Sequence, residues 1–143
     1  AACDRRPVRP SARGTRPTGN GTRRVHSTAG ANLVAMAEFE AYESYRRGVS
    51  LLDAGDAHAA SVALERAKRL EPDSTSIRET LARAYLAMRR DRSAADEFAA
   101  IVAVHPTDHY AHYGLGRALD RLGDRAAAFR HYRLAEIFGS KLR

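Results

Sequence analysis

Apolar residues recur every three or four positions from Asn32 to the end of the chain, in runs of roughly 14 residues separated by short polar turns. No stretch alternates with the two-residue period of a half-buried strand. The pattern therefore predicts an all-α fold. Six helices are expected, at about 32–54, 57–70, 76–88, 93–104, 109–122 and from the turn at 123–125 to about 138.

The turns between these runs contain residues that end and start helices. Gly55 is expected to end the first helix, and Asp56 to cap the second. Asp73 or Ser74 is expected to cap the third helix, and Asp91 the fourth. Each predicted break therefore has a local chemical cause.

The sequence repeats with an offset of 34 residues, the interval that separates Pro72 from Pro106. Small residues, the large residues that follow them, and the apolar residues of each second helix keep the same offset. The aligned sets are Gly48, Ala82 and Gly116; Leu51, Tyr85 and Leu119; Ala60, Ala94 and Ala128; Leu64, Phe98 and Tyr132; and Ala67, Ile101 and Ala135. Two helices approach closely only where side chains are small, and a large neighbour then fills the remaining space. The repeat therefore predicts three pairs of closely packed helices.

This pattern resembles the tetratricopeptide repeat, in three copies at about 41–74, 75–108 and 109–142. The resemblance implies a right-handed α-solenoid of three helix-turn-helix repeats, whose first helices line a concave groove that holds peptides. The sequence departs from the family where Ser44, Arg78 and His112 occupy the usual Trp position, where Arg47 replaces Leu, and where Ile101 replaces Ala.

The same register selects the residues that would face the groove. They are Tyr42, Tyr45, Arg46, Val49, Glu79, Arg83, Tyr110, Tyr113 and Arg117, with Asp53, Thr80, Ala87, Asp120 and Arg121 at further groove positions. Tyr and Arg often dominate binding energy at interfaces, and Arg pairs with carboxylates and stacks on aromatic rings. We therefore expect a non-catalytic protein–protein interaction scaffold that prefers a segment with acidic and apolar or aromatic residues. The alternative is that some of these tyrosines only fill space between adjacent helix pairs.

One subclass of the family grips the C-terminal carboxylate of chaperones with Lys and Asn. The matching positions here hold Tyr45, Val49, Thr80, Tyr110 and Gly114. Chaperone-tail binding is therefore not expected.

The net charge of +7 is concentrated at the start of the chain. Residues 1–35 contain seven Arg and one Asp, whereas residues 36–143 contain 17 basic and 16 acidic residues. Residues 1–31, rich in Arg, Pro and Gly, are expected to form a disordered tail before a folded domain at 32–143. Three interpretations of this segment stay open: a solvated tail, upstream sequence that is not native because translation starts at Met36, or a basic arm that binds nucleic acid or an acidic polymer.

The single cysteine, Cys3, has no partner for an internal disulfide, which is compatible with a reducing compartment. Because Ala1 and Ala2 precede it, a lipoprotein-signal remnant is one interpretation, and a trimmed or wrongly assigned start is the other. No apolar run approaches the roughly 20 residues of a membrane-spanning helix. A cytoplasmic protein is expected.

Leu134, Ile137 and Phe138 lie at the end of the last predicted pair without an obvious cover. They are expected to fold inward, to mediate self-association, or to dock on a larger protein of which this chain is a piece, which makes a structural assembly module a third functional hypothesis.

His105, His109 and His112 lie close together in the sequence, but they are expected to be turn and packing residues. We expect no metal, no cofactor and no enzymatic activity.

Overall fold

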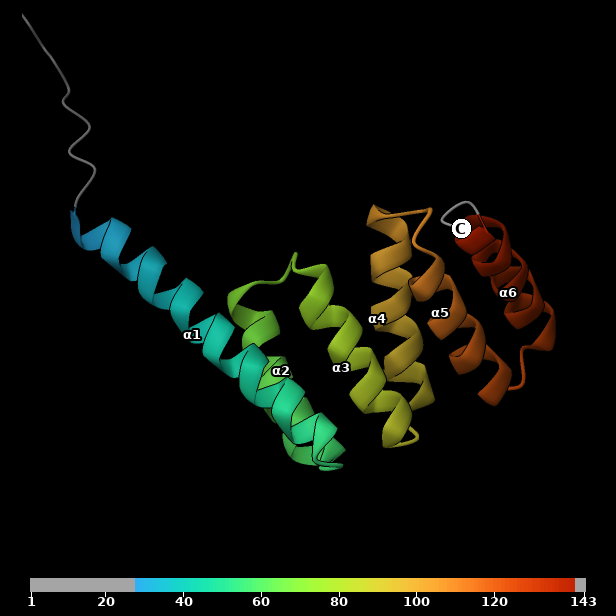
Figure 1. Ribbon diagram of the computed structural model, residues 1–143, viewed down its shortest axis with the longest axis horizontal. Coiled ribbons are helices and arrows are strands. Elements are labelled where there is room, and N and C mark those ends of the chain that lie inside the picture. Colours follow the sequence, from blue (N-terminus) through green and yellow to red (C-terminus); the bar gives the residue numbers. More distant parts are fainter. Residues whose placement is uncertain (1–27, 141–143) are drawn as a thin grey trace, which may run out of the picture.

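The computed structural model describes residues 28–140, which form six α-helices and no strand (Figure 1). Each helix packs against the next one along the chain, so that the six form an α-solenoid. This confirms the predicted all-α class and its solenoid architecture. The helices are α1 (Thr28–Asp53), α2 (Ala57–Leu70), α3 (Thr75–Ala87), α4 (Asp91–Val104), α5 (His109–Arg121) and α6 (Arg125–Ser140).

The first helix begins earlier than the predicted start at Asn32. Residues 28–31, which were predicted to belong to the tail, form the first turn of α1, and Thr28 is the first residue that the structure describes. Ala29 and Ala31 are strong helix formers, and a single Gly30 between them costs only about 1 kcal/mol. The rest of the predicted tail lies outside the described residues, as does Cys3.

The two helices of each pair are joined by the same turn, repeated at the offset of 34. Gly55, Arg89 and Gly123 all have positive φ angles, of 87°, 62° and 90°. The amide of the next residue in each turn donates to the carbonyl oxygen five positions back, at 2.9–3.0 Å. One left-handed residue per turn therefore reverses the chain.

The fourth helix shows why Asp91 was wrongly predicted as a cap. Asp56, Asp108 and Asp124 precede their helices, and each accepts a hydrogen bond from the amide three residues later, at 2.9–3.0 Å. The residue that matches Asp56 after one repeat is Arg90, which is the N-cap of α4 and makes no side-chain cap bond. The turn geometry, and not the residue type, therefore fixes where α4 begins.

Helix pairs come close together at glycines that face large apolar residues. A Cβ atom added at Gly48 would overlap the side chain of Leu64, and one added at Gly116 would lie 2.8 Å from the ring of Tyr132. These two contacts are related by twice the repeat offset. Gly114 makes a contact of the same kind between two pairs, because it faces Phe98 of the preceding pair. The small residues therefore set the spacing within pairs and also between α4 and α5.

Two of the three residues that replace the expected Trp, Arg78 and His112, hold the turns between consecutive pairs. The side chain of Arg78 donates from Nε to the carbonyl oxygen of Pro72 at 3.0 Å. His112, one repeat later, bonds through Nε2 to the carbonyl oxygen of Pro106 at 2.8 Å. Arg78 also donates from Nη1 to the buried Glu97 at 2.8 Å, and Lys68 pairs with the same carboxylate. Glu97 thus joins α2, α3 and α4.

Arg89 is expected to destabilise its turn because a side chain with Cβ disfavours positive φ. Arg89→Gly should raise the free energy of unfolding by about 0.5–1 kcal/mol, measured by urea denaturation. Gly55→Ala and Gly123→Ala should lower it by a similar amount. A destabilised Arg89→Gly variant would contradict this account of the turn.

Gly114→Leu is expected to cost about 1–3 kcal/mol of unfolding free energy, because the added side chain overlaps Phe98. The double variant Gly114→Leu/Phe98→Ala should recover part of that loss in thermal denaturation. Gly30→Ala is the matched control and should cause no loss, since nothing lies within 4 Å of the added Cβ.

Candidate functional site

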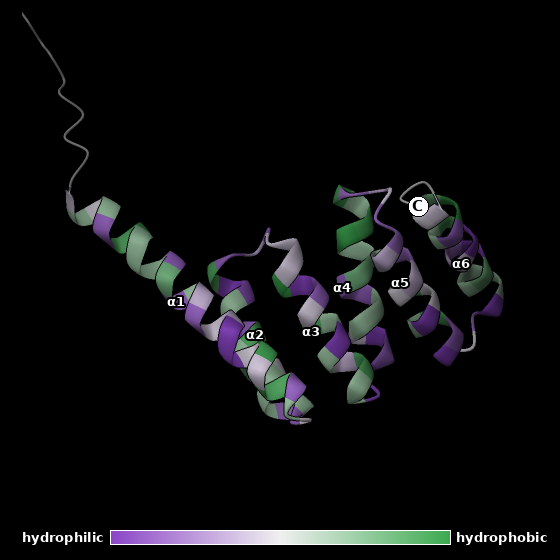
Figure 2. Cartoon of the chain, in the orientation of Figure 1, coloured by the Kyte–Doolittle hydropathy of each residue, from purple (hydrophilic) through white to green (hydrophobic). Residues whose placement is uncertain are grey.

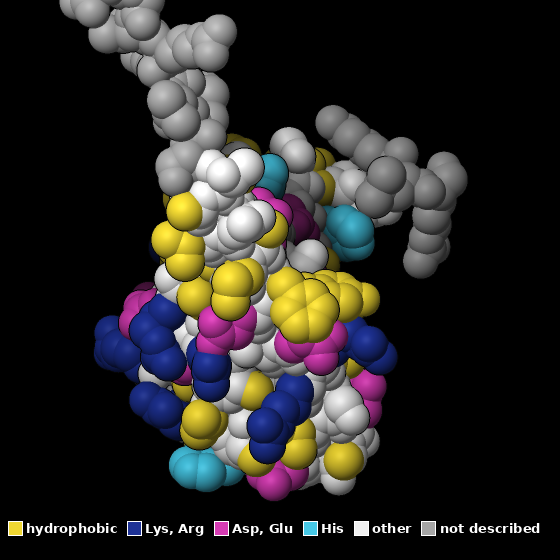
Figure 3. Space-filling model, turned by 90° about the vertical axis from the view of Figure 1, so that its left-hand side faces the viewer, with side chains coloured by type: hydrophobic (Ala, Val, Ile, Leu, Met, Phe, Trp, Pro, Cys, Tyr) yellow, Lys and Arg dark blue, Asp and Glu magenta, His cyan; other side chains and the backbone are white. Residues whose placement is uncertain are grey.

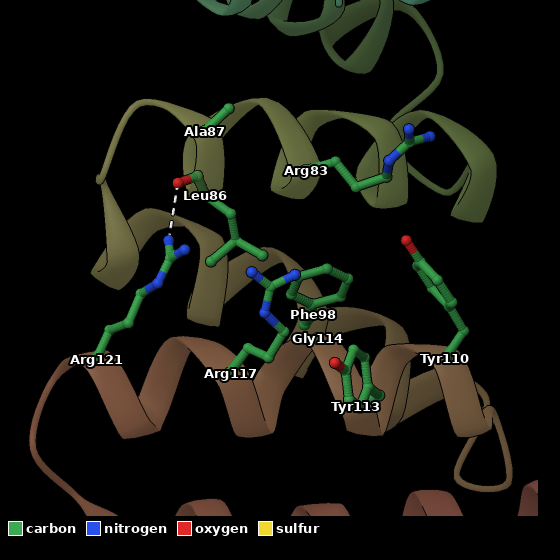
Figure 4. A pocket seen from close by; sticks show the side chains of 9 residues that line it. All are labelled: Arg83, Leu86, Ala87, Phe98, Tyr110, Tyr113, Gly114, Arg117 and Arg121. Atoms are coloured by element: carbon green, nitrogen blue, oxygen red, sulfur yellow. Dashed lines mark hydrogen bonds between the residues drawn. The ribbon is translucent and has the colours of Figure 1, made fainter.

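A pocket of about 270 Å³ lies between α3 and α5, above α4. We name it the α3–α5 groove; its lining residues are Arg83, Leu86, Ala87, Phe98, Tyr110, Tyr113, Gly114, Arg117 and Arg121 (Figure 4). Leu86 and Phe98 are buried and supply its apolar surface, while the tyrosines and arginines stand around them. Gly114 contributes by letting α5 approach Phe98 closely.

Three arginines and no carboxylate line this groove. Arg121 is already engaged, because its Nη1 donates to the carbonyl oxygen of Leu86 at 2.9 Å (Figure 4). The same nitrogen also donates to Asp91 at 3.2 Å. Arg83 and Arg117 make no hydrogen bond or ion pair with any residue between 28 and 140. Their guanidinium groups can therefore bind a carboxylate from outside the chain.

Glu79 on α3 is an acidic residue close enough to Arg83 for the two charges to influence each other. Burial raises the pKa of Glu79, and the neighbouring Asp108 raises it further, whereas Arg83 lowers it. The positive charge of Arg83 therefore stabilises the ionised form of Glu79, although the two side chains form no ion pair.

The two tyrosines of α5 are exposed but differ in their contacts. In Figure 4 the hydroxyl of Tyr110 points across the groove towards Arg83. The ring of Tyr113 lies 5.8 Å from that of Tyr132 on α6, at an interplanar angle of 50°. Tyr113 therefore packs against α6 on one side and borders the α3–α5 groove on the other.

The predicted groove residues divide into two groups. Arg83, Tyr110, Tyr113 and Arg117 come together in the α3–α5 groove. Those of the first pair, and Glu79, do not line it. The exposed Tyr42 has the guanidinium of Arg46 5.9 Å from its ring centroid, whereas Tyr45 and Val49 are half-buried, Tyr45 against the core.

Three lining residues, Leu86, Phe98 and Gly114, were not among the residues predicted to face the groove. Phe98 was assigned to the core by its repeat position, and the core assignment is correct, since it is 1% exposed. Phe98 can be buried and still line the pocket, because Gly114, which packs on its ring, has no side chain. Gly114 was therefore the feature of the sequence that could have indicated a pocket next to Phe98.

A second cluster joins α5 to α6. The Nδ1 atoms of His112 and His131 lie 2.9 Å apart, and the ring of Phe138 lies 5.6 Å from that of His112. Because Nε2 of His112 donates to Pro106, its Nδ1 accepts the proton of His131 when both rings are neutral. Phe138 thus packs inward, whereas Ile137 stays 45% exposed.

In residues 28–140 no three His, Cys, Asp or Glu side chains are placed to hold a metal ion.

Acid is expected to weaken the α5–α6 contact. Burial lowers the pKa of His131 below its ordinary value of 6.5, and His112 and Arg130 lower it further. At a pH between the folded and unfolded pKa values, His131 is protonated in the unfolded chain but neutral in the folded chain. The free energy of unfolding therefore falls as the pH drops from about 6.5 through the folded pKa. Urea denaturation of His131→Gln at pH 7.5 and 5.5 should show a smaller pH dependence than the unsubstituted chain. His58→Gln, at an exposed position, should not change it.

The family model of the bacterial transcriptional activator domain, BTAD, matches residues 22–138. The chain belongs to this family. Within the described part of this BTAD chain, no helix combines the length and hydropathy needed to cross a membrane. A search of the curated proteins found no matching sequence.

Solved structures with the same fold include the second TPR domain of Spaghetti (RPAP3), bound to the HSP90 peptide SRMEEVD. It has 16% sequence identity and a TM-score of 0.69, over 75% of this chain and 98% of that one. A crystal structure of MamA has 22% identity and a TM-score of 0.68, over 78% of this chain and 65% of that one. MamA MSR-1 C2 has 18% identity and a TM-score of 0.68, over 81% of this chain and 69% of that one. These likenesses confirm a TPR-like fold for this BTAD.

Proposed function

We propose that this BTAD chain is a non-catalytic protein-interaction module of a transcriptional activator, and that it binds a segment of a partner protein in the α3–α5 groove. The proposal rests on four side chains that surround one apolar surface. Arg83 and Arg117 form no ion pair within residues 28–140, and Tyr110 and Tyr113 are exposed beside them. The family description supports the role in transcription. Such a role agrees with the expected cytoplasmic location.

The ligand we propose has an acidic residue next to an aromatic or apolar one. Arg83 and Arg117 would hold the carboxylate, and Leu86, Phe98 and the tyrosine rings would cover the apolar side chain. The TPR domain of Spaghetti offers a parallel, because the peptide in its structure contains three acidic residues. Tyr42, Tyr45, Arg46, Val49 and Glu79 belong to the proposed surface as its continuation towards the first helix pair.

Chaperone-tail recognition is not part of the proposal. Thr80 is buried and donates its hydroxyl to the carbonyl oxygen of Ser76 at 2.9 Å. Gly114 is covered by Phe98. Neither position offers a donor to a terminal carboxylate.

The test is selection of binders from a random peptide display library on the full chain. Selected peptides should be enriched in Asp or Glu beside Phe, Tyr or Leu. Arg83→Glu/Arg117→Glu should weaken the best peptide by about 100-fold or more, measured by fluorescence anisotropy, because two attractive pairs become repulsive. Arg92→Glu/Arg130→Glu changes the net charge equally at exposed positions away from the groove and should have little effect.

Equal binding by the groove variant would contradict the proposal. Loss of binding on deletion of residues 1–27, with the groove variant unaffected, would favour the alternative in which the basic tail binds nucleic acid or an acidic polymer. That alternative has one observation in its favour: residues 28–140 hold 15 basic and 16 acidic residues, so the excess positive charge lies mainly before residue 28.

A further inference from the structure

Most of the first half of α1 extends beyond the end of α2, and Glu40, at the end of this half, is joined to α2 by its ion pair with Arg66 (Figure 1). We name residues 28–40 the α1 projection. Four of its large apolar side chains are 60–67% exposed: Leu33, Val34, Met36 and Phe39. Figure 2 shows mainly apolar and neutral colours along this half of the helix. Apolar residues on several sides of one helix are typical of a helix that is buried in an assembly.

Beside the projection, a hollow of about 520 Å³ opens at the start of the solenoid. We name it the N-terminal hollow; it is lined by Ser44, Arg47 and Leu51 of α1 and by Ala59, Val62, Ala63, Arg66 and Arg69 of α2. Figure 3, which views this end, shows basic side chains between apolar ones. Val62 is 63% exposed there. In the later pairs α2 packs against α3 and α4 against α5, but within residues 28–140 no helix precedes α1 in this way.

One stripe of α1 runs through both features and is complementary to itself. Its residues, spaced by three or four and therefore on one face, are Leu33, Met36, Glu40, Glu43, Arg47 and Leu51. Along the helix they read apolar, acidic, basic, apolar. When a second copy of this stripe runs antiparallel with Met36 opposite Leu51, Arg47 of each copy lies opposite Glu40 of the other and within one turn of Glu43.

The charges on this stripe favour a second copy over the chain's own tail. Arg66 pairs with Glu40 of the same chain, whereas Glu43 and Arg47 make no ion pair within residues 28–140. The preceding segment, residues 1–27, contains seven Arg and one Asp and would repel a hollow that contains three arginines. The α1 projection contains no basic residue, so it lacks this repulsion.

We propose that two copies of this chain form an antiparallel dimer through α1. The projection of each copy lies in the N-terminal hollow of the other, with Leu33 and Met36 against Leu51 and Val62 of the partner copy. Arg47 of each copy lies opposite Glu40 of the other and within one turn of Glu43, and the twofold axis passes near Glu43 and Ser44, so that the two Arg47 side chains offset the two Glu43 charges beside the axis. The interface is isologous, so it closes as a dimer. It shares no residue with the α3–α5 groove, so the two proposals can fail independently.

Sedimentation equilibrium of the full chain should show a monomer–dimer equilibrium. At low salt, Arg47→Glu and Glu43→Arg should each raise the dimer dissociation constant roughly tenfold or more, because like charges then face each other. The double variant Glu43→Arg/Arg47→Glu should restore dimerisation, which a loss of folding would not allow. Met36→Asp should weaken the dimer, and Arg83→Glu/Arg117→Glu should leave it unchanged.

Cross-linking gives a second measurement. In a Cys3→Ser background, Ser44→Cys should form a disulfide-linked dimer on mild oxidation, whereas Phe129→Cys on α6 should not. A monomer at high micromolar concentration would overturn the proposal. So would a dimer that tolerates Arg47→Glu but is lost with Ile137→Asp, since that result would favour self-association through Leu134, Ile137 and Phe138. Dimerisation that appears only after deletion of residues 1–27 would show that the tail covers this face.

Discussion

The structure depends on the close approach of helices at positions without bulky side chains. Gly48 lies against Leu64, Gly116 against Tyr132, and Gly114 against Phe98. At each contact a large apolar residue occupies the space that a glycine leaves, and this sets the distance between two helix axes. Because the first two contacts are related by twice the 34-residue offset, the same spacing recurs along the chain. A solenoid with a regular surface follows from that repetition.

Much of the fold could be predicted because small and large residues recur in the sequence at an offset of 34 positions. The six helices lie at the expected places to within a few residues, and Gly55 and Asp56 act as predicted. The start of α4 could not be read from Asp91 alone, since the left-handed Arg89 fixes the turn and no residue type signals it. Alignment with Gly55 and Asp56 would have placed the cap at Arg90. The interior role of His112 followed from its Trp position, but its bonds to Pro106 and His131 depend on the tertiary arrangement.

Of the predicted groove residues, only those on α3 and α5 come together in one pocket. Arg83, Tyr110, Tyr113 and Arg117 share a pocket because α3 and α5 both contribute first-helix positions of their pairs. Tyr42 and Arg46 belong to the same register but lie outside that pocket, because one helix pair, α3–α4, separates their pair from that of α5. The exposed projection of α1 was missed altogether, because its apolar residues fit the same helical period as core residues. Exposure becomes visible only when α2 is seen to end beside the middle of α1.

Tyr113 belongs to two contacts at once, since one side of its ring borders the groove and the other rests on Tyr132. Displacing the terminal helix would therefore remove the support that orients this ring. Occupancy of the proposed groove and packing of α6 against α5 would then be thermodynamically linked: a ligand that holds the Tyr113 ring in place would also stabilise α6, and acid that weakens the α5–α6 contact would also lower the affinity of the ligand.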